Sequence, residues 1–213
     1  MRLGGFDGIF FRTCEFISKI AYANVLWFLF MVLGLGIFGI APATVALFAV
    51  NRKWVMGEND VPIFQTFWKV YKKEFVKANL LGLIVFLAGY IIYVDLAYFP
   101  PTNMVSVIIR YIIIAVGVMF IVTTIYVFPV YVHYNGNIKS YIKFAFLFAF
   151  SYPLFTFAII IGVMIIYTLL SLVPGVIPFF GICVVSYFTS WIAMQVFNRV
   201  QAKSMFTLAE EQT

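Results

Sequence analysis

The chain has 213 residues, of which 64% are hydrophobic and 10% are charged, with a formal net charge of +6. Soluble domains average about 45–50% apolar and about 25% charged residues, so 14 basic and 8 acidic side chains are too few to cover a water-soluble protein of this size. The composition excludes a water-soluble domain and predicts one membrane domain over 1–213, an all-α polytopic bundle of transmembrane helices.

Residues 1–19 are expected to form an interfacial helix at the N-terminus. Large apolar side chains recur there at three- and four-residue steps, whereas Asp7, Arg12, Glu15 and Lys19 interrupt the run. These charges exclude a span and a cleavable signal peptide within this segment.

Residues 20–56 are expected to form a helical hairpin. Residues 20–38 can span a bilayer alone, and the residues that interrupt a longer helix predict the turn: Gly34, Gly36, Gly39 and Pro42. Pro42 suits the first turn of the second helix, where its missing N–H is not required. The second arm, 42–56, is short at about 1.5 Å per residue, so it crosses only if Asn51 and the two basic residues after it snorkel to the headgroups.

Residues 62–77 show the clearest amphipathic pattern. Aromatic side chains recur along one helical face and lysines lie away from it; this candidate docking helix consists of Phe64, Phe67, Trp68, Lys69, Lys72, Lys73 and Lys77. We expect the helix to lie flat on the cytoplasmic leaflet with its rings toward the lipid. Two roles stay open, an anchor to anionic lipid and a docking surface for a cytoplasmic partner.

Four longer apolar segments predict transmembrane helices at 79–99, 105–132, 144–172 and 175–197, followed by a cytoplasmic tail at 198–213. Pro100, Pro101 and Pro174 delimit them, because proline has no backbone N–H to donate. Pro153 is expected to kink the third of these segments and to free the carbonyl four residues earlier, which a neighbouring hydroxyl can satisfy.

The placement of the 14 Lys and Arg residues favours six spans over five. If 42–56 crosses, every basic residue except Arg110 lies on one face, as the cytoplasmic excess of Lys and Arg in membrane proteins predicts. We therefore expect six spans with both termini in the cytoplasm. Five spans with a re-entrant 42–56 is the alternative.

No catalytic, metal or cofactor motif is recognisable. The run at 34–39 matches G-x-G-x-x-G, but it lies in an apolar span rather than between a strand and a helix, so we interpret its glycines as helix contacts and a turn. The chain has one histidine and two cysteines far apart in the sequence. We expect no enzyme activity, no cofactor, no metal and no nucleic-acid partner.

Asp95 and Arg110 are the charged residues that lie well inside the predicted spans. At a rise of about 1.5 Å per residue they stand about 7.5 and 13.5 Å from their shared turn, so the side chains can meet. A lone charge at bilayer depth costs at least about 2.5 kcal/mol, and we interpret the two as an intramembrane ion pair that fixes the hairpin. Snorkelling to the outer headgroups and a substrate or ion site are the alternatives.

One stretch of the sequence is similar to a known pattern. The run IFGIAPATVALFAV at 37–50 is followed by RKWVMGE at 52–58 and by FQTFWK at 64–69. This order resembles the YesL family of small bacterial integral membrane proteins, which has G-P-A-x-x-A-L, a basic R-K-W/L-x-x-G-E turn and an F-x-x-F-[WF] amphipathic helix; Ala41 stands where the family more often has Gly. The resemblance implies a bacterial plasma-membrane protein whose genes often lie beside genes for carbohydrate ABC importers. It brings no catalytic or binding residues.

Our first hypothesis is an accessory subunit, held against the permease of such an importer and in contact with the lipid bilayer, with no sugar-binding residue assigned. The alternatives are a passive channel or secondary carrier, and a membrane sensor or assembly factor. A channel or carrier needs a polar pathway at the midplane. Besides Asp95 and Arg110, its candidates are the hydroxyl residues Thr123, Thr124, Ser186, Thr189 and Ser190.

Overall fold

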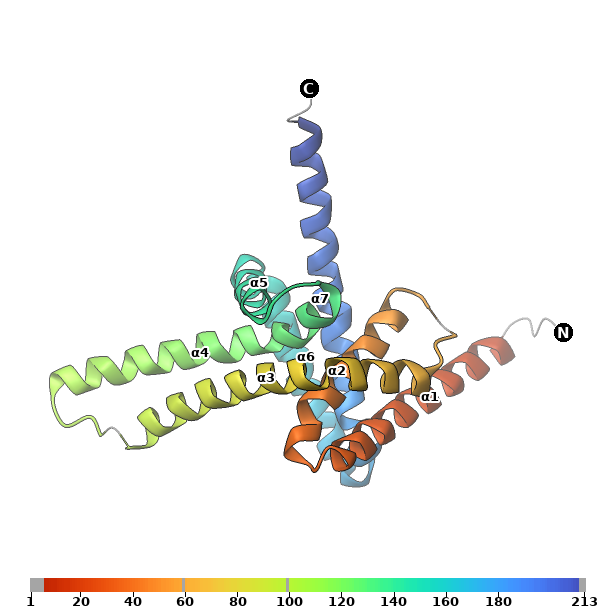
Figure 1. Cartoon of the computed structure of the whole chain (residues 1–213), viewed down its shortest axis with the longest axis horizontal. Helices are drawn as coiled ribbons and strands as arrows, with labels where there is room; N and C mark the ends of the chain where they lie inside the picture. The colour runs from red at the N-terminus through yellow and green to blue at the C-terminus, as the bar shows by residue number, and fades with distance from the viewer. Residues whose placement is uncertain (1–5, 59, 99, 211–213) are drawn as a thin grey trace.

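The computed structural model describes residues 6–58, 60–98 and 100–210, and side chains within 11–58, 60–98 and 100–202. The described residues form helices and no strand, which confirms the all-α prediction (Figure 1). The helices are α1 (Phe6–Leu33), α2 (Ile37–Val55), α3 (Ile63–Tyr98), α4 (Met104–His133), α5 (Ile138–Ser151), α6 (Pro153–Ser171), the 3-10 helix η1 (Pro174–Val176) and α7 (Ile177–Glu210). Parts of the predicted N-terminal helix and tail, 1–5 and 211–213, lie outside the described residues.

α1 and α2 form the predicted hairpin, and the turn lies at two of the three predicted glycines, whereas Gly39 lies inside α2. Gly34 and Gly36 lie between the two helices, and Gly36 takes a φ of 74°, which glycine adopts without a steric cost. Gly39 lies so close to Met31 that a Cβ atom there would overlap the backbone of α1. The two helices can therefore approach each other directly after the turn.

α2 lies in the centre of the protein and contacts α1, α3, α4 and α7. The predicted start of this arm at Pro42 is wrong: the turn is complete by Gly36, so Pro42 lies inside α2. At its other end α2 again meets α1, where the rings of Phe16 and Trp54 lie 5.9 Å apart. α2 therefore runs antiparallel to α1 and returns the chain to the level of Phe16.

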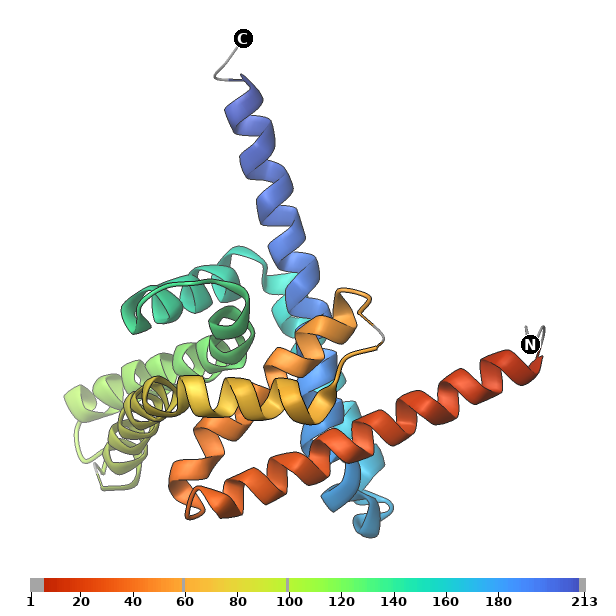
Figure 2. The same cartoon turned by 45° about the vertical axis from the view of Figure 1, so that its right-hand side comes forward.

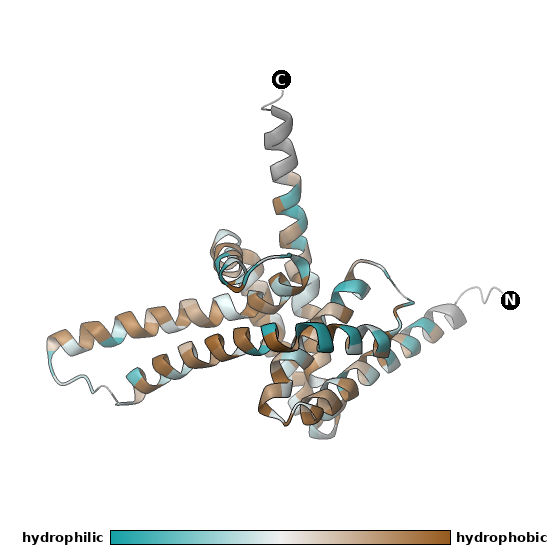
Figure 3. Ribbon diagram, in the orientation of Figure 1, coloured by the Kyte–Doolittle hydropathy of each residue, from teal (hydrophilic) through white to brown (hydrophobic). Residues whose placement is uncertain are grey.

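The predicted amphipathic helix and the span after it are one helix. α3 runs without a break from Ile63 to Tyr98, so the predicted division into 62–77 and 79–99 is wrong. The sequence KANL at 77–80 contains no proline or glycine that would stop a helix. α3 and α4 project together from the rest of the protein as an arm (Figures 1 and 2). Figure 3 shows hydrophobic residues along most of this arm and hydrophilic residues at the start of α3.

The predicted 144–172 span is two helices. α5 ends at Ser151 and α6 begins at Pro153, so the kink expected at this proline is a complete break. Pro153 leaves the carbonyl of Ala149 without its helical donor, and the hydroxyl of Thr156 donates to that oxygen at 2.9 Å. The expected role of a neighbouring hydroxyl is confirmed, whereas the single long helix is wrong.

The core consists of two hydrophobic clusters that both include residues of α2, α3 and α7. One packs α1 onto these helices around Phe30, and the other packs α4, α5 and α6 onto them around Tyr126. The side chains of Phe30 and Tyr126 are 1% and 0% exposed. α2 and α7 thus connect the two halves of the protein.

Five helical segments in the described part of the chain are long and apolar enough to cross a membrane: Phe11–Leu33, Ile63–Tyr98, Met104–His133, Pro153–Ser171 and Pro174–Ala202. The protein is therefore a multi-pass membrane protein. α2 is not among the five, because the polar run NRK at 51–53 lowers its hydropathy. Length and composition alone therefore give the five spans of the alternative and leave out α2, the crossing on which the six-span prediction depends.

Candidate functional site

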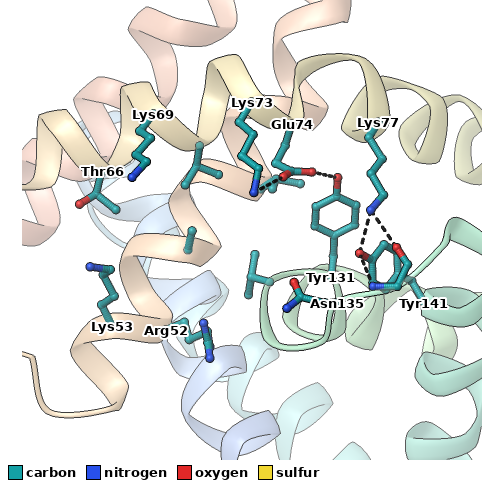
Figure 4. A pocket seen from close by; sticks show the side chains of 15 residues that line it. Arg52, Lys53, Thr66, Lys69, Lys73, Glu74, Lys77, Tyr131, Asn135 and Tyr141 are labelled. Carbon is teal, nitrogen blue, oxygen red and sulfur yellow. Dashed lines mark hydrogen bonds and ion pairs between the residues drawn. The ribbon is translucent and has the colours of Figure 1, made fainter.

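A pocket of about 700 Å³ lies between α2, α3, the end of α4 and the segment that leads into α5 (Figure 4). This volume falls within the range of small-molecule sites, about 300–1,000 Å³. Its basic lining residues are Arg52, Lys53, Lys69, Lys73 and Lys77, and Glu74 is the acidic residue among the described lining side chains. The pocket thus joins segments that lie far apart in the sequence, 52–53, 66–77 and 131–141.

Glu74 is held by two neighbours in the wall of the pocket. The Tyr131 hydroxyl donates a hydrogen bond to its Oε2 at 2.7 Å, and Lys73 Nζ lies 3.6 Å from its Oε1. The Lys73 side chain is 76% exposed, so solvent screens this ion pair and it contributes little to stability. The hydrogen bond from Tyr131 is therefore stronger than the ion pair with Lys73, and it connects α3 to α4 at the base of the arm.

Lys77 fixes the connection between α4 and α5. Its Nζ donates to the carbonyl oxygen of Gly136 at 2.8 Å and to the hydroxyl oxygen of Tyr141 at 3.0 Å, and it lies 4.9 Å from the centroid of the Tyr141 ring. The backbone N–H of Gly136 also donates to the Tyr141 oxygen, at 3.1 Å. Because that oxygen accepts two hydrogen bonds, the hydroxyl proton of Tyr141 remains available to a further acceptor.

Arg52 lies between this pocket and a smaller cavity of about 10 Å³, which is also lined by His133 and Ser190. The Nε of Arg52, the Nδ1 of His133 and the Oγ of Ser190 are buried and have no hydrogen-bond partner among the described residues. A cavity of about 10–15 Å³ with two to four polar neighbours suits one water molecule. The smaller cavity therefore has the size and lining for a water that bridges α2, α4 and α7.

Asn24, which the sequence did not single out, connects α1 to the first turns of α7. Its Oδ1 accepts hydrogen bonds from the backbone N–H groups of Ile182 and Cys183 at 3.1 and 2.8 Å, and its Nδ2 donates to the carbonyl of Pro178 at 2.5 Å. Its side chain is 0% exposed. The signal that could have found it is a lone amide inside an apolar span, since a polar group at that depth requires partners.

Asn51 makes a second polar connection to α7. Its Nδ2 donates to the Ser186 hydroxyl at 2.7 Å, and Ser186 in turn donates to the carbonyl of Cys183 at 3.0 Å. Asn51 is 0% exposed, so the expectation that it snorkels to the headgroups is wrong. The hydrogen bond to Ser186 holds the amide inside the protein instead.

Asp95 and Arg110 lie on the two helices of the arm, as predicted. Asp95 is exposed on α3 and Arg110 is half-buried on α4. An ion pair between their side chains stays a prediction.

The candidate docking helix divides its residues among three surroundings. Phe67 is buried, and its ring lies 4.9 Å from that of Phe30 on α1, so the prediction that all its rings face the lipid is wrong. α1 covers this part of the helix and takes the place of lipid. Lys69, Lys73 and Lys77 line the pocket, whereas Phe64, Trp68 and Lys72 are exposed.

The hydroxyls considered for a transport pathway bond mainly within their own helices. Thr123, Thr124 and Thr189 each donate to the carbonyl four residues earlier, at 2.7 to 2.8 Å. They satisfy backbone acceptors rather than facing one another. In the part of the chain that the structure describes, no group of three or more His, Cys, Asp or Glu residues could hold a metal ion.

Comparison with known proteins identifies relatives along almost the whole chain. Residues 20–96 match the family model described as "Protein of unknown function, DUF624". "Uncharacterized protein YteU" of Bacillus subtilis (strain 168) is 41% identical over 94% of this chain and 90% of its own length. "Uncharacterized protein YesV" of the same organism is 41% identical over 91% of this chain and 93% of its own.

"Uncharacterized protein YesL" of Bacillus subtilis (strain 168) is 35% identical over 70% of both chains. No solved structure matches the chain. The identities and their coverage confirm the resemblance carried by residues 37–69, and the chain belongs to the YesL family of small bacterial integral membrane proteins.

Proposed function

We propose that the chain is a non-enzymatic accessory subunit of a bacterial carbohydrate ABC importer, held against the membrane permease through the α3–α4 arm. The class of partner rests on the resemblance to the YesL family, whose genes often lie beside genes for such importers. The place of contact rests on the arm itself.

The observation that carries this proposal is how little of the arm the protein covers. Only 6% of the apolar stretch of α3 and 11% of that of α4 are buried, against 33% for α1 and 39% for the last span. Gly89 and Gly117 lie where α3 and α4 contact each other, because a Cβ atom at either position would lie 3.3 Å from a side chain of the other helix. Large side chains cover the outer faces, so lipid or the helices of another protein must pack against them.

Tyrosines on the arm favour a protein over lipid as the neighbour. Tyr90 and Tyr93 are 55% and 64% exposed on α3. Tyr90 lies eight residues from the end of α3 at Tyr98, about 12 Å along the helix at about 1.5 Å per residue. A phenol hydroxyl without a hydrogen-bond partner costs about 1–3 kcal/mol in an apolar environment. A polar acceptor on a partner helix would remove that cost.

The start of α3 offers a second contact at the opposite end of the helix. Phe64 and Trp68 are exposed there, and Lys72 Nζ lies 4.2 Å from the centroid of the Trp68 ring. Exposed aromatic residues with a nearby cation are typical of protein interfaces. A cytoplasmic domain of the importer is the partner that we propose for this face.

We further propose that the protein lies in the bacterial plasma membrane with both termini in the cytoplasm. The support is that basic residues from the end of α2 and the start of α3 line the same pocket as the segment between α4 and α5. An excess of Lys and Arg on one face is typical of the cytoplasmic side of a membrane protein. Both termini share one side only if α2 crosses in addition to the five longer segments, and the return of α2 to the level of Phe16 supports that crossing.

Site-specific photocrosslinking from the arm tests the proposed partner. A photoreactive amino acid replaces Tyr90 in one variant and Tyr167 in the control, a 70% exposed residue of α6, whose apolar stretch is as little buried as that of α4. We expect irradiation of native membranes to link position 90, and not position 167, to a permease subunit. Repeated recovery of the protein without permease subunits, from crosslinked membranes and in mild detergent, would sink the proposal.

A further inference from the structure

The charges around the large pocket do not balance. Five basic residues face one carboxylate among its described lining side chains. That carboxylate, Glu74, already accepts the hydrogen bond from Tyr131 and lies near Lys73. Like charges held together in a partly enclosed site raise the local concentration of anions. The pocket therefore attracts a negatively charged ligand.

Several of the basic side chains retain hydrogen-bonding capacity toward the pocket. Lys69 is exposed, and no hydrogen bond or ion pair joins it to another described residue. Arg52 lines the pocket as well, although its buried Nε lies at the smaller cavity with His133 and Ser190. Lys53 pairs only with Glu58, at 3.3 Å and with half of that carboxylate exposed. Figure 4 shows Lys53 on α2 and Lys69 on α3 pointing toward each other across one end of the pocket, with Arg52 beside Lys53 on α2.

Lys77 has a different role. It is held by Gly136 and Tyr141, and these contacts leave the Tyr141 hydroxyl proton available on the wall of the pocket. The available groups thus include a guanidinium, two ammonium groups and a neutral hydroxyl donor. Arginine recognises phosphate through paired N–H donors, and lysine supplies a compact positive charge.

We propose that this pocket binds the phosphate group of an anionic ligand, that Lys53 and Lys69 hold it, and that Arg52 adds its positive charge to the same lining. The headgroup of an anionic phospholipid is the source that the surroundings favour. Val45, Ala49, Val70 and Val132 form the apolar part of the lining, and the pocket lies where the hydrophilic start of α3 gives way to its apolar part. This inference does not depend on the proposed partner, because the pocket lies at the base of the arm.

The test compares the full-length protein with charge-neutralised variants in lipid nanodiscs. Lys69→Gln removes a cation of the pocket, and Lys72→Gln is the matched control, since Lys72 stacks on Trp68 outside the lining residues of the same helix. Native mass spectrometry counts the phosphatidylglycerol retained from nanodiscs that mix it with phosphatidylcholine. Thermal unfolding in pure phosphatidylcholine nanodiscs, with inorganic phosphate against chloride at matched ionic strength, reports a soluble phosphate.

The wild type is expected to retain a bound phosphatidylglycerol. Lys69→Gln is expected to weaken phosphatidylglycerol binding about tenfold, because the variant loses one charge-assisted hydrogen bond. Lys72→Gln is expected to bind phosphatidylglycerol as the wild type does. If phosphatidylglycerol is not retained but inorganic phosphate raises the unfolding temperature of the wild type and not of Lys69→Gln, the phosphate site is supported with a soluble ligand as its source. Equal losses in Lys69→Gln and Lys72→Gln, or no effect of either probe on the wild type, would overturn it.

Discussion

The hydrogen bond between Asn51 and Ser186 allows a direct measurement of what one buried polar contact contributes to this bundle. The donor lies on α2 and the acceptor on α7, 2.7 Å apart, and both side chains are almost completely buried. The perturbation is a double-mutant cycle of Asn51→Ala, Ser186→Ala and the combination of the two.

The two single variants differ in whether the remaining side chain of the pair keeps a hydrogen-bond partner. In Ser186→Ala the Nδ2 of Asn51 loses its hydrogen-bond acceptor. In Asn51→Ala the Ser186 hydroxyl keeps its hydrogen bond to the carbonyl of Cys183. An unsatisfied buried donor costs about 1–3 kcal/mol in soluble proteins, but interhelical hydrogen bonds in membranes average about 0.6 kcal/mol with a maximum of about 1.7. We expect Ser186→Ala to lower the free energy of unfolding by about 1–2 kcal/mol, and the coupling within the cycle to be about 1 kcal/mol.

The assay is reversible unfolding in mixed micelles, in which increasing dodecyl sulfate unfolds the purified protein and tryptophan fluorescence follows the loss of structure. Ser171→Ala is the control, because Ser171 is exposed and donates only to a carbonyl of its own helix. It should change the free energy of unfolding by less than about 0.5 kcal/mol. Additive single effects, with a coupling within about 0.3 kcal/mol of zero, would refute the reasoning.

Three other measurements address packing, the break between helices and topology. Gly162→Ala should lower the free energy of unfolding by about 1–3 kcal/mol, because its Cβ would overlap an aromatic ring of α7, whereas Gly175→Ala has no atom within 4 Å of the new methyl and should be nearly neutral. In the same assay, Thr156→Val should lower the free energy of unfolding by about 1–3 kcal/mol, because the carbonyl of Ala149 then loses the hydrogen bond from Thr156. A membrane-impermeant maleimide should label exposed Cys14 only from the cytoplasmic side and buried Cys183 only after unfolding; labelling of Cys14 on intact spheroplasts would contradict the proposed orientation.

The backbone features that depend on single residues could be predicted from the sequence. A glycine turn such as Gly36 and a proline break such as Pro153 act on their own neighbours, so local chemistry identifies them. The length of a helix depends less on the chemistry of single residues. α3 continues past Lys77 because no residue there stops it, although its surroundings change from pocket to membrane along its length.

The pocket and the buried amides could not be predicted in the same way. Arg52 and Lys69 line one pocket only because α2 returns beside α1 and leads the chain to the start of α3. The sequence predicts one solvated face for the lysines of 62–77. The periodicity of a single helix cannot show which neighbouring helix covers that face. Asn24 looked like an isolated polar residue because its partners are backbone groups more than 150 positions away.

The link from Asn24 to α7 has a consequence for biosynthesis. Its partners on Pro178, Ile182 and Cys183 are synthesised more than 150 residues after Asn24, so the amide lacks these partners until α7 begins to emerge from the ribosome. A nascent chain that stops short of α7 would keep that amide in hydrocarbon and would be an evident target for membrane proteases. The contact between α1 and α7 thus makes synthesis of α7 a condition for burying the polar group of α1.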